Sequence, residues 1–103
     1  MAIYQYTIFM NKDRNYFKNQ ARLHRALANE ARLVIINCLY KREHSVSELT
    51  DRVGLDQSTV SKHLSILLSL GIVENRKEKN RVYYKLMTPC LIDMYKCASK
   101  VME

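Results

Sequence analysis

The sequence predicts a mainly α-helical protein with a small β-hairpin, in the order helix, helix, helix, helix, hairpin, helix. Three observations support this fold class. Apolar residues recur at helical spacing along most of the chain, only two glycines and one proline interrupt it, and two β-prone runs adjoin within residues 72–86. A length of 103 residues suits one domain, which we expect over residues 14–103 after an N-terminal arm at residues 1–13.

The first part of this domain contains two predicted helices. Residues 14–27 place Leu23 and Leu27 among basic side chains, a pattern typical of an amphipathic helix. Residues 29–40 follow, with Asn29 as the N-cap, and they are apolar almost all round. We therefore expect the second helix to be central and buried.

Two further helices are marked by their caps. Residues 45–48 (Ser-Val-Ser-Glu) form a capping box, in which the Ser hydroxyl and the Glu carboxylate each satisfy a free backbone amide. The box opens a short helix that ends at Gly54. Asp56 caps the next helix, which runs to Leu70. Apolar residues at i, i+4 and i+7 mark the inner face of this helix: Val60, Leu64 and Leu67.

The pattern then changes to two β-prone runs. Ile72–Lys77 and Arg81–Leu86, joined by residues 78–80, predict a hairpin. Thr88 and Pro89 suit the cap and first turn of a last helix, which reaches about residue 101.

The charge of the chain indicates an anionic partner. Lys and Arg number 17 against 10 for Asp and Glu, which gives a net charge of +7. This excess alone does not distinguish nucleic acid, an acidic protein and a membrane surface. No apolar run approaches the ~20 residues that span a bilayer, and residues 1–10 lack the features of a signal peptide. We therefore expect a cytoplasmic protein with reduced cysteines and no membrane partner. Residues 1–10 are interpreted either as an arm that packs on another subunit or as a poorly ordered terminus.

The short helix, the turn at Gly54 and the longer helix after it form a helix-turn-helix pattern. The DNA major groove admits one α-helix, and short polar side chains on its first turns let the backbone approach the base edges. Gln can pair bidentately with adenine, while Ser and Thr bond either bases or phosphates. The alternative is that these residues form only the solvated face of an ordinary helix. The residues predicted to bind DNA here are Gln57, Ser58, Thr59, Ser61, Lys62 and His63.

The hairpin favours the DNA-binding interpretation. Residues 72–86 contain five basic and two acidic residues, a local excess of +3. A protruding basic ribbon beside a helix-turn-helix is a wing, which would follow the phosphates or the minor groove. The alternative is a surface hairpin that its charges keep soluble. The wing residues predicted to bind DNA are Arg76, Lys77, Lys79 and Arg81.

Five blocks of sequence follow one another along the chain: LANEARL at 27–33, SVSEL at 45–49, QSTVSKHL at 57–64, GIV at 71–73 and RVYYKL at 81–86. Together they resemble the ArsR/SmtB family of bacterial winged-helix repressors. The resemblance implies a winged helix-turn-helix domain that forms a homodimer through its first and last helices. It also implies a palindromic operator in double-stranded DNA, from which an inducer releases the protein.

The resemblance also indicates where an inducer would act. Ser45-Val46-Ser47 replaces the Cys-Val-Cys metal motif of the family, and the final helix lacks the histidines of its zinc site, so no metal ligand is assigned. Cys90 and Cys97, two turns apart on the last helix, resemble cysteines that sense arsenite, oxidants or reactive sulfur, with Cys38 as a third candidate. We therefore expect a thiol-reactive inducer, such as arsenite or a soft metal ion. A purely structural role for the cysteines, in a repressor without sensing, remains the alternative.

Two other classes of function were compared with this one. A winged-helix module that binds protein would often lack the polar first turns and the basic ribbon that this sequence has. An enzyme is not expected, because the sequence offers no nucleophile–base pair, carboxylate dyad or phosphate-binding loop.

Overall fold

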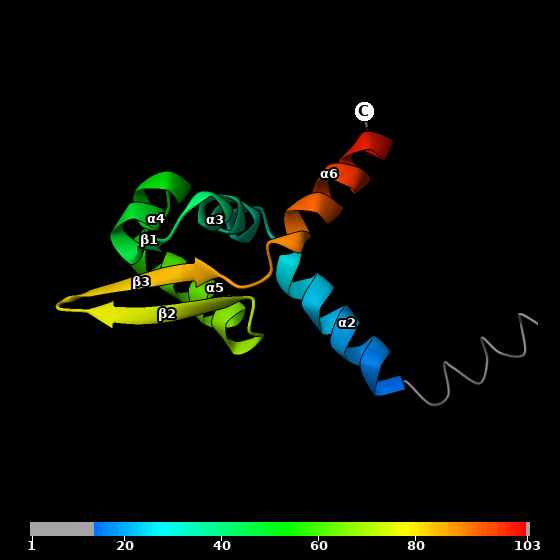
Figure 1. Ribbon diagram of the computed structural model, residues 1–103, viewed down its shortest axis with the longest axis horizontal. Coiled ribbons are helices and arrows are strands. Elements are labelled where there is room, and N and C mark those ends of the chain that lie inside the picture. The colour runs from blue at the N-terminus through cyan, green and yellow to red at the C-terminus, as the bar shows by residue number, and fades with distance from the viewer. Residues whose placement is uncertain (1–13, 103) are drawn as a thin grey trace, which may run out of the picture.

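The computed structural model describes residues 14–102, which begin and end with a long helix (Figure 1). The predicted arm at residues 1–13 lies outside this range. The helices are α2 (Arg14–Leu27), α3 (Glu30–Lys41), α4 (Val46–Val53), α5 (Gln57–Ser69) and α6 (Cys90–Met102). The strands are β1 (His44–Ser45), β2 (Val73–Glu78) and β3 (Arg81–Leu86). The predicted order of helices and hairpin is confirmed, with β1 as an addition.

Local hydrogen bonds explain where three helices begin. The Asn29 side chain accepts a hydrogen bond from the Arg32 N–H at 3.1 Å, as expected of an N-cap. Ser45 and Glu48 form the predicted capping box at the start of α4, at 3.2 and 2.9 Å. Asp56 caps α5 by accepting from the backbone N–H of Thr59 at 2.7 Å. These three predictions are confirmed.

The ends of α4 and α5 depend on glycine, and the start of α6 differs from the prediction. Gly54 and Gly71 have φ angles of +78° and +75°, a left-handed conformation that other residues rarely adopt. The predicted Thr88 cap is wrong, because its buried hydroxyl has no hydrogen-bond partner among the described residues. Its backbone carbonyl accepts the N–H of Leu91 instead, at 3.1 Å.

The hydrophobic core lies where α3, α4, α5 and the sheet meet. Its fully buried side chains come from all of these elements and include Ile35, Ile36, Leu49, Val60, Leu64, Leu67, Ile72 and Val73. Helix α3 is central, but it is not buried all round as expected: Leu33 and Val34 are 38% and 37% exposed. Among the described residues, these two apolar side chains of α3 are therefore only partly covered, Leu33 beside α2 and α6 and Val34 beside the turn after α4.

The sheet has three antiparallel strands in the order β1-β3-β2. Strand β1 was not predicted, because two residues are too few to produce an alternating pattern. His44 and Ser45 pair with Tyr84 and Tyr83 of β3. His44 is only 4% exposed, and its Nδ1 lies 2.8 Å from the Arg42 carbonyl oxygen.

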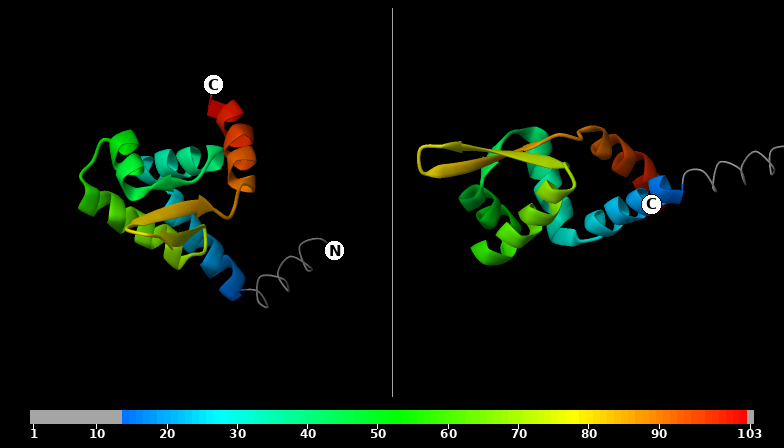
Figure 2. Two further views of the ribbon diagram at one scale, coloured as in Figure 1. Left: turned by 60° about the vertical axis from the view of Figure 1, so that its left-hand side comes forward. Right: turned by 90° about the horizontal axis from the view of Figure 1, so that it is seen from below.

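The described chain is elongated, with extents of 57 × 33 × 20 Å. Helices α2 and α6 lie at one end and diverge from each other, while the β2–β3 hairpin projects from the opposite end (Figures 1 and 2). Helices α4 and α5 lie at the hairpin's end of the molecule. Among the described helices, none has the length and apolar character needed to cross a lipid bilayer.

Candidate nucleic-acid interface

Helices α4 and α5 form the predicted helix-turn-helix, and the core fixes the orientation of α5. Val60, Leu64 and Leu67 are each 0% exposed, so the inner face of α5 is fully packed. A helix held on one side in this way can present its opposite side to a ligand without losing its position.

The outer side of α5 carries most of the predicted polar residues. Gln57, Ser58 and Lys62 are exposed, while Thr59 and Ser61 are half-buried at the edges of this face. Ser58 and Lys62 stand at i and i+4 on the same side, and the exposed Ser65 continues that row at i+7. Ser65 was not among the predicted residues, although its helical spacing from Ser58 indicates the same face.

The cap of α5 also fixes the hydrogen-bonding direction of Ser58. The Ser58 hydroxyl donates to Asp56 Oδ1 at 3.1 Å. Hydrogen bonds from Thr59, first through its side chain and then its backbone, and from Ser58 hold the pKa of Asp56 below its usual value. Asp56 therefore remains an acceptor at neutral pH. Because the Ser58 proton is engaged, its free lone pairs are suited to accept from an amino group such as adenine N6 or cytosine N4.

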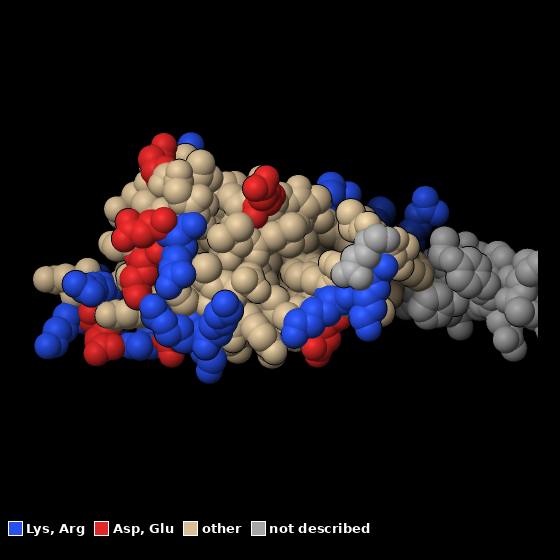
Figure 3. Space-filling view, turned by 90° about the horizontal axis from the view of Figure 1, so that it is seen from above, with Lys and Arg blue, Asp and Glu red and all other residues tan. Residues whose placement is uncertain are grey.

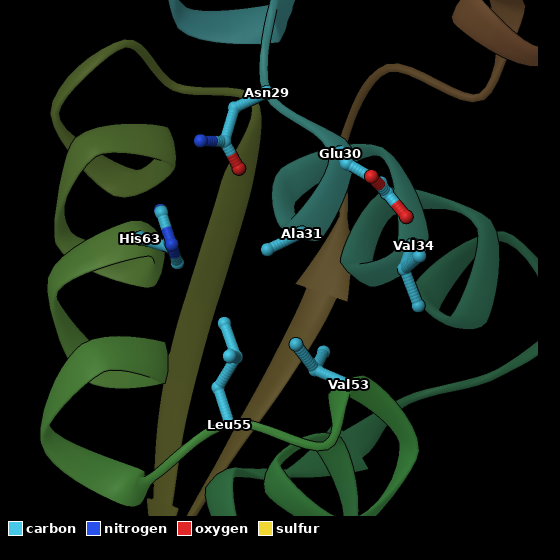
Figure 4. Close-up of a pocket in the computed structure, with 7 residues that line it drawn as sticks. All are labelled: Asn29, Glu30, Ala31, Val34, Val53, Leu55 and His63. Atoms are coloured by element: carbon cyan, nitrogen blue, oxygen red, sulfur yellow. The ribbon is translucent and has the colours of Figure 1, made fainter.

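His63 lies apart from these residues. It points from α5 towards α3, into a pocket that Asn29, Val34 and Leu55 help to line (Figure 4). Its Nδ1 atom accepts a hydrogen bond from Arg32 Nε at 3.1 Å. Burial and then the charge of Arg32 lower the pKa of His63, so its ring is neutral at pH 7. The structure thus separates His63 from the outer face that holds Ser58 and Lys62.

The wing is the hairpin of β2 and β3, in which Glu78 pairs with Arg81 across the turn. Lys77, Lys79, Arg81 and Lys85 are all exposed, and none forms an ion pair with another described residue. Figure 3 shows basic side chains gathered at this end of the molecule, with carboxylates among them. These four cations are available to an anionic partner.

Arg76 is the exception among the predicted wing residues. Its Nε atom lies 2.8 Å from Glu43 Oε1, and its Nη1 atom pairs with Glu78. Its guanidinium also stacks 4.8 Å from the centre of the Tyr83 ring. Hydrogen bonds from Arg76, first to Glu78 and then to Glu43, raise its pKa. This arginine ties the wing to the loop before β1, and its charge is already balanced by carboxylates.

The candidate sensing cysteines lie in two different environments. Cys38 is half-buried against the core, whereas Cys90 and Cys97 on α6 are exposed. All three are free thiols. Within residues 14–102 of one chain, no group of three or more His, Cys, Asp or Glu residues is arranged to hold a metal ion.

A packed helix-turn-helix with a polar outer helix face, followed by a cationic hairpin, defines a winged helix-turn-helix DNA-binding domain. Comparison with known proteins agrees. The profile described as "Bacterial regulatory protein, arsR family" matches residues 29–75. The chain belongs to the ArsR family of transcriptional regulators, as the sequence resemblance predicted. Its relatives are DNA-binding regulators, so the chain is not an enzyme.

Several relatives are known individually. Transcriptional activator HlyU of Vibrio cholerae is 46% identical over 72 residues, which are 67% of this chain and 67% of HlyU. A structure described as reduced HlyU from that organism has a TM-score of 0.73 at 36% identity, covering 84% of this chain and 93% of that one.

Two further solved structures extend the likeness. The transcriptional repressor BigR from Xylella fastidiosa has a TM-score of 0.72 at 30% identity, covering 86% of this chain and 91% of that one. The homodimeric winged helix-turn-helix domain of Mb0332 from Mycobacterium bovis has a TM-score of 0.76 at 30% identity, covering 88% and 84%. The predicted fold class and family are therefore confirmed.

Proposed function

We propose that the protein is a sequence-specific transcriptional repressor that places α5 in the DNA major groove and holds the flanking phosphates with its wing. The observation that carries this proposal is the polar outer face of α5, built on a fully buried inner face. We expect Gln57, Ser58, Thr59, Ser61 and Lys62 to contact DNA from α5, joined by Ser65. From the wing we expect Lys77, Lys79 and Arg81 to contact phosphates. A protein with this task works in the cytoplasm, where the bacterial chromosome lies.

The proposed repressor acts as a homodimer through α2 and α6. Together with α3, these helices border an apolar groove, whose lining includes Leu27, Leu33, Met94 and Ala98. Leu33 and Met94 are 38% and 42% exposed in the single chain, so a partner would remove apolar surface from water. The Mb0332 domain is described as homodimeric. Two-fold symmetry would place two copies of α5 on a palindromic operator.

The direction of regulation is part of the proposal, because BigR is described as a repressor and HlyU as an activator. A reporter gene behind the operator distinguishes the two. Expression should fall when the protein is supplied, whereas a rise would identify an activator.

The operator is found by selecting duplexes from a randomised DNA library, and binding is then measured by fluorescence anisotropy. Tight binding to the selected duplex, with weaker and salt-dependent binding to a scrambled duplex, is the expected result. Binding that is absent, or insensitive to salt, would instead favour a module that binds protein.

We further propose that the inducer reacts with thiols. Cys90 and Cys97 are accessible in the described chain, and a relative has been solved in a form described as reduced. Release from the selected duplex should be tested with arsenite, zinc, cadmium, peroxide and polysulfide. Cys90→Ser and Cys97→Ser should abolish release, with Cys38→Ser as the comparison for a half-buried thiol. If none of these compounds releases the DNA, the protein is a repressor without thiol or metal sensing.

A further inference from the structure

Arg32 joins two helices that the proposed function assigns to different tasks. Its Nη1 atom donates to the Ala26 carbonyl oxygen of α2 at 2.7 Å. Its Nε atom donates to His63 Nδ1 of α5 at 3.1 Å. The side chain itself belongs to the first turn of α3, where its backbone N–H is held by the Asn29 cap. One half-buried guanidinium therefore connects α2, α3 and α5.

Each of these contacts has a chemical reason. Ala26 lies in the last turn of α2, where carbonyl groups lack a partner within the helix and a nearby cation is favoured. His63 Nδ1 accepts a proton only if the ring is neutral and carries its hydrogen on Nε2. The planar fork of an arginine directs its N–H groups to both acceptors at once, which the single ammonium group of a lysine does not reproduce.

We propose that Arg32 is a positioning residue for DNA recognition, which sets the orientation of α5 relative to α2 by holding Ala26 and His63 together. This inference rests on the proposed function, in which α2 belongs to the dimer interface and α5 to the DNA interface. The distance between two recognition helices must match half-sites about 34 Å apart. Because α2 belongs to the dimer interface, a change in the angle between α2 and α5 changes the distance between the two copies of α5. Specific binding should therefore depend on Arg32 more than non-specific binding does.

Substitutions of His63 separate this role from a direct contact with a base. In His63→Asn the side-chain oxygen can occupy the place of Nδ1 and accept from Arg32. In His63→Gln the amide group reaches instead towards the place of Nε2, the atom left for a DNA contact. His63→Leu offers neither group, and Arg32→Lys keeps the charge without the fork.

Binding measurements compare these variants on the selected and scrambled duplexes. Arg32→Lys and His63→Leu should each weaken binding to the selected duplex about tenfold, which is the effect of losing one charge-assisted hydrogen bond. Their affinity for the scrambled duplex should change less than about twofold. His63→Asn should bind like the wild type, and the double variant Arg32→Lys/His63→Leu should be no weaker than the weaker single variant. Wild-type behaviour of His63→Gln together with loss in His63→Asn would overturn the proposal in favour of a base contact. Unchanged discrimination in a folded Arg32→Lys would also overturn it, and if this variant fails to fold, the His63 series decides.

A pH series supplies a readout that a merely structural residue would not change. Protonation turns Nδ1 into a donor that faces the guanidinium, so it can no longer accept from Arg32. The ratio of the affinities for the selected and scrambled duplexes should therefore fall as the pH drops through the pKa of His63. The charged group that faces the ring is Arg32 of α3, whereas the Glu30 carboxylate of the same helix points away from it (Figure 4), and the end of α4 and its turn contribute only the uncharged Val53 and Leu55. His63→Asn should remove this pH dependence, and a dependence that survives in it would contradict the proposal.

Nitrogen NMR of the ring tests the bond without DNA. The neutral ring should carry its hydrogen on Nε2, and Arg32→Lys should shift backbone signals in both α2 and α5. A hydrogen on Nδ1, or signals in α5 that Arg32→Lys leaves unchanged, would overturn the proposal. Because this measurement needs no operator, it tests whether Arg32 joins α2 and α5 even if the wild type binds no DNA and the proposed function fails.

Discussion

The wing offers the most direct test of DNA binding. Lys79 lies in the turn of the hairpin and Arg81 directly after it, and both are exposed and form no ion pair with another described residue. Replacing both by alanine removes two cations from each subunit. Lys79 already has a φ of 56°, where alanine is no more strained than lysine, so the fold of the hairpin should be preserved.

The size of the effect follows from counterion release. Each phosphate contact contributes about 0.9 to the slope of log affinity against log salt concentration, so four contacts in a dimer contribute about 3.6. Over a fourfold rise in salt, from about 50 to 200 mM, these contacts alone account for a loss of about a hundredfold in affinity. Lys79→Ala/Arg81→Ala should therefore bind all sequences more weakly and lose much less affinity as salt is added.

Fluorescence anisotropy at several salt concentrations, with selected and scrambled duplexes, measures this slope. Lys100→Ala is the control, because it removes one exposed charge per subunit near the end of α6, far from the wing (Figure 1), and it is used once its mass in solution shows that the dimer is intact. Its slope should stay within about 0.5 of the wild type. A slope that is unchanged in Lys79→Ala/Arg81→Ala would remove the wing from the DNA interface.

Three further predictions concern the recognition helix, a cap and the hairpin turn. Gln57→Ala and Ser61→Ala should lower discrimination by about 1–3 kcal/mol at a contacted base, and equal losses on selected and scrambled DNA would contradict that role. The backbone N–H of Ser45, followed by Arg42, lowers the pKa of Glu48 from 4.5 to about 2. Because this side chain is 40% exposed, solvent screening reduces its contribution, and Glu48→Ala should cost about 1–2 kcal/mol at pH 7 in urea unfolding. A lowered pKa stabilises the fold above the unfolded value, so the wild type should lose this advantage as pH falls from 4.5 through about 2, and a constant difference between the two proteins would refute the assignment. Lys79→Gly should raise the free energy of unfolding by about 0.5–1 kcal/mol, because glycine adopts the positive φ without strain; a loss of stability would show that the lysine side chain supports the turn.

The sequence by itself determined the order of the elements and most of their bounds. Caps and periodicity act between residues three or four positions apart, so the bonds of Asn29, Ser45 and Asp56 could be predicted from neighbouring residues. The polar character of the outer face of α5 was predictable for the same reason. Ser65 was missed only because the predicted set was limited to the first turns of the helix.

The tertiary structure decided what depends on residues far apart in the chain. Arg76 appeared to be a free cation until the fold placed it against Glu43, 33 positions away. From the sequence, His63 was predicted to contact DNA like its neighbours on α5. In the structure, α3 brings Arg32, 31 positions away, to the Nδ1 atom of His63. Strand β1, with its buried His44, exists because β3 lies beside it. No local pattern records such contacts, because the free energy of each depends on the packing that brings the two partners together.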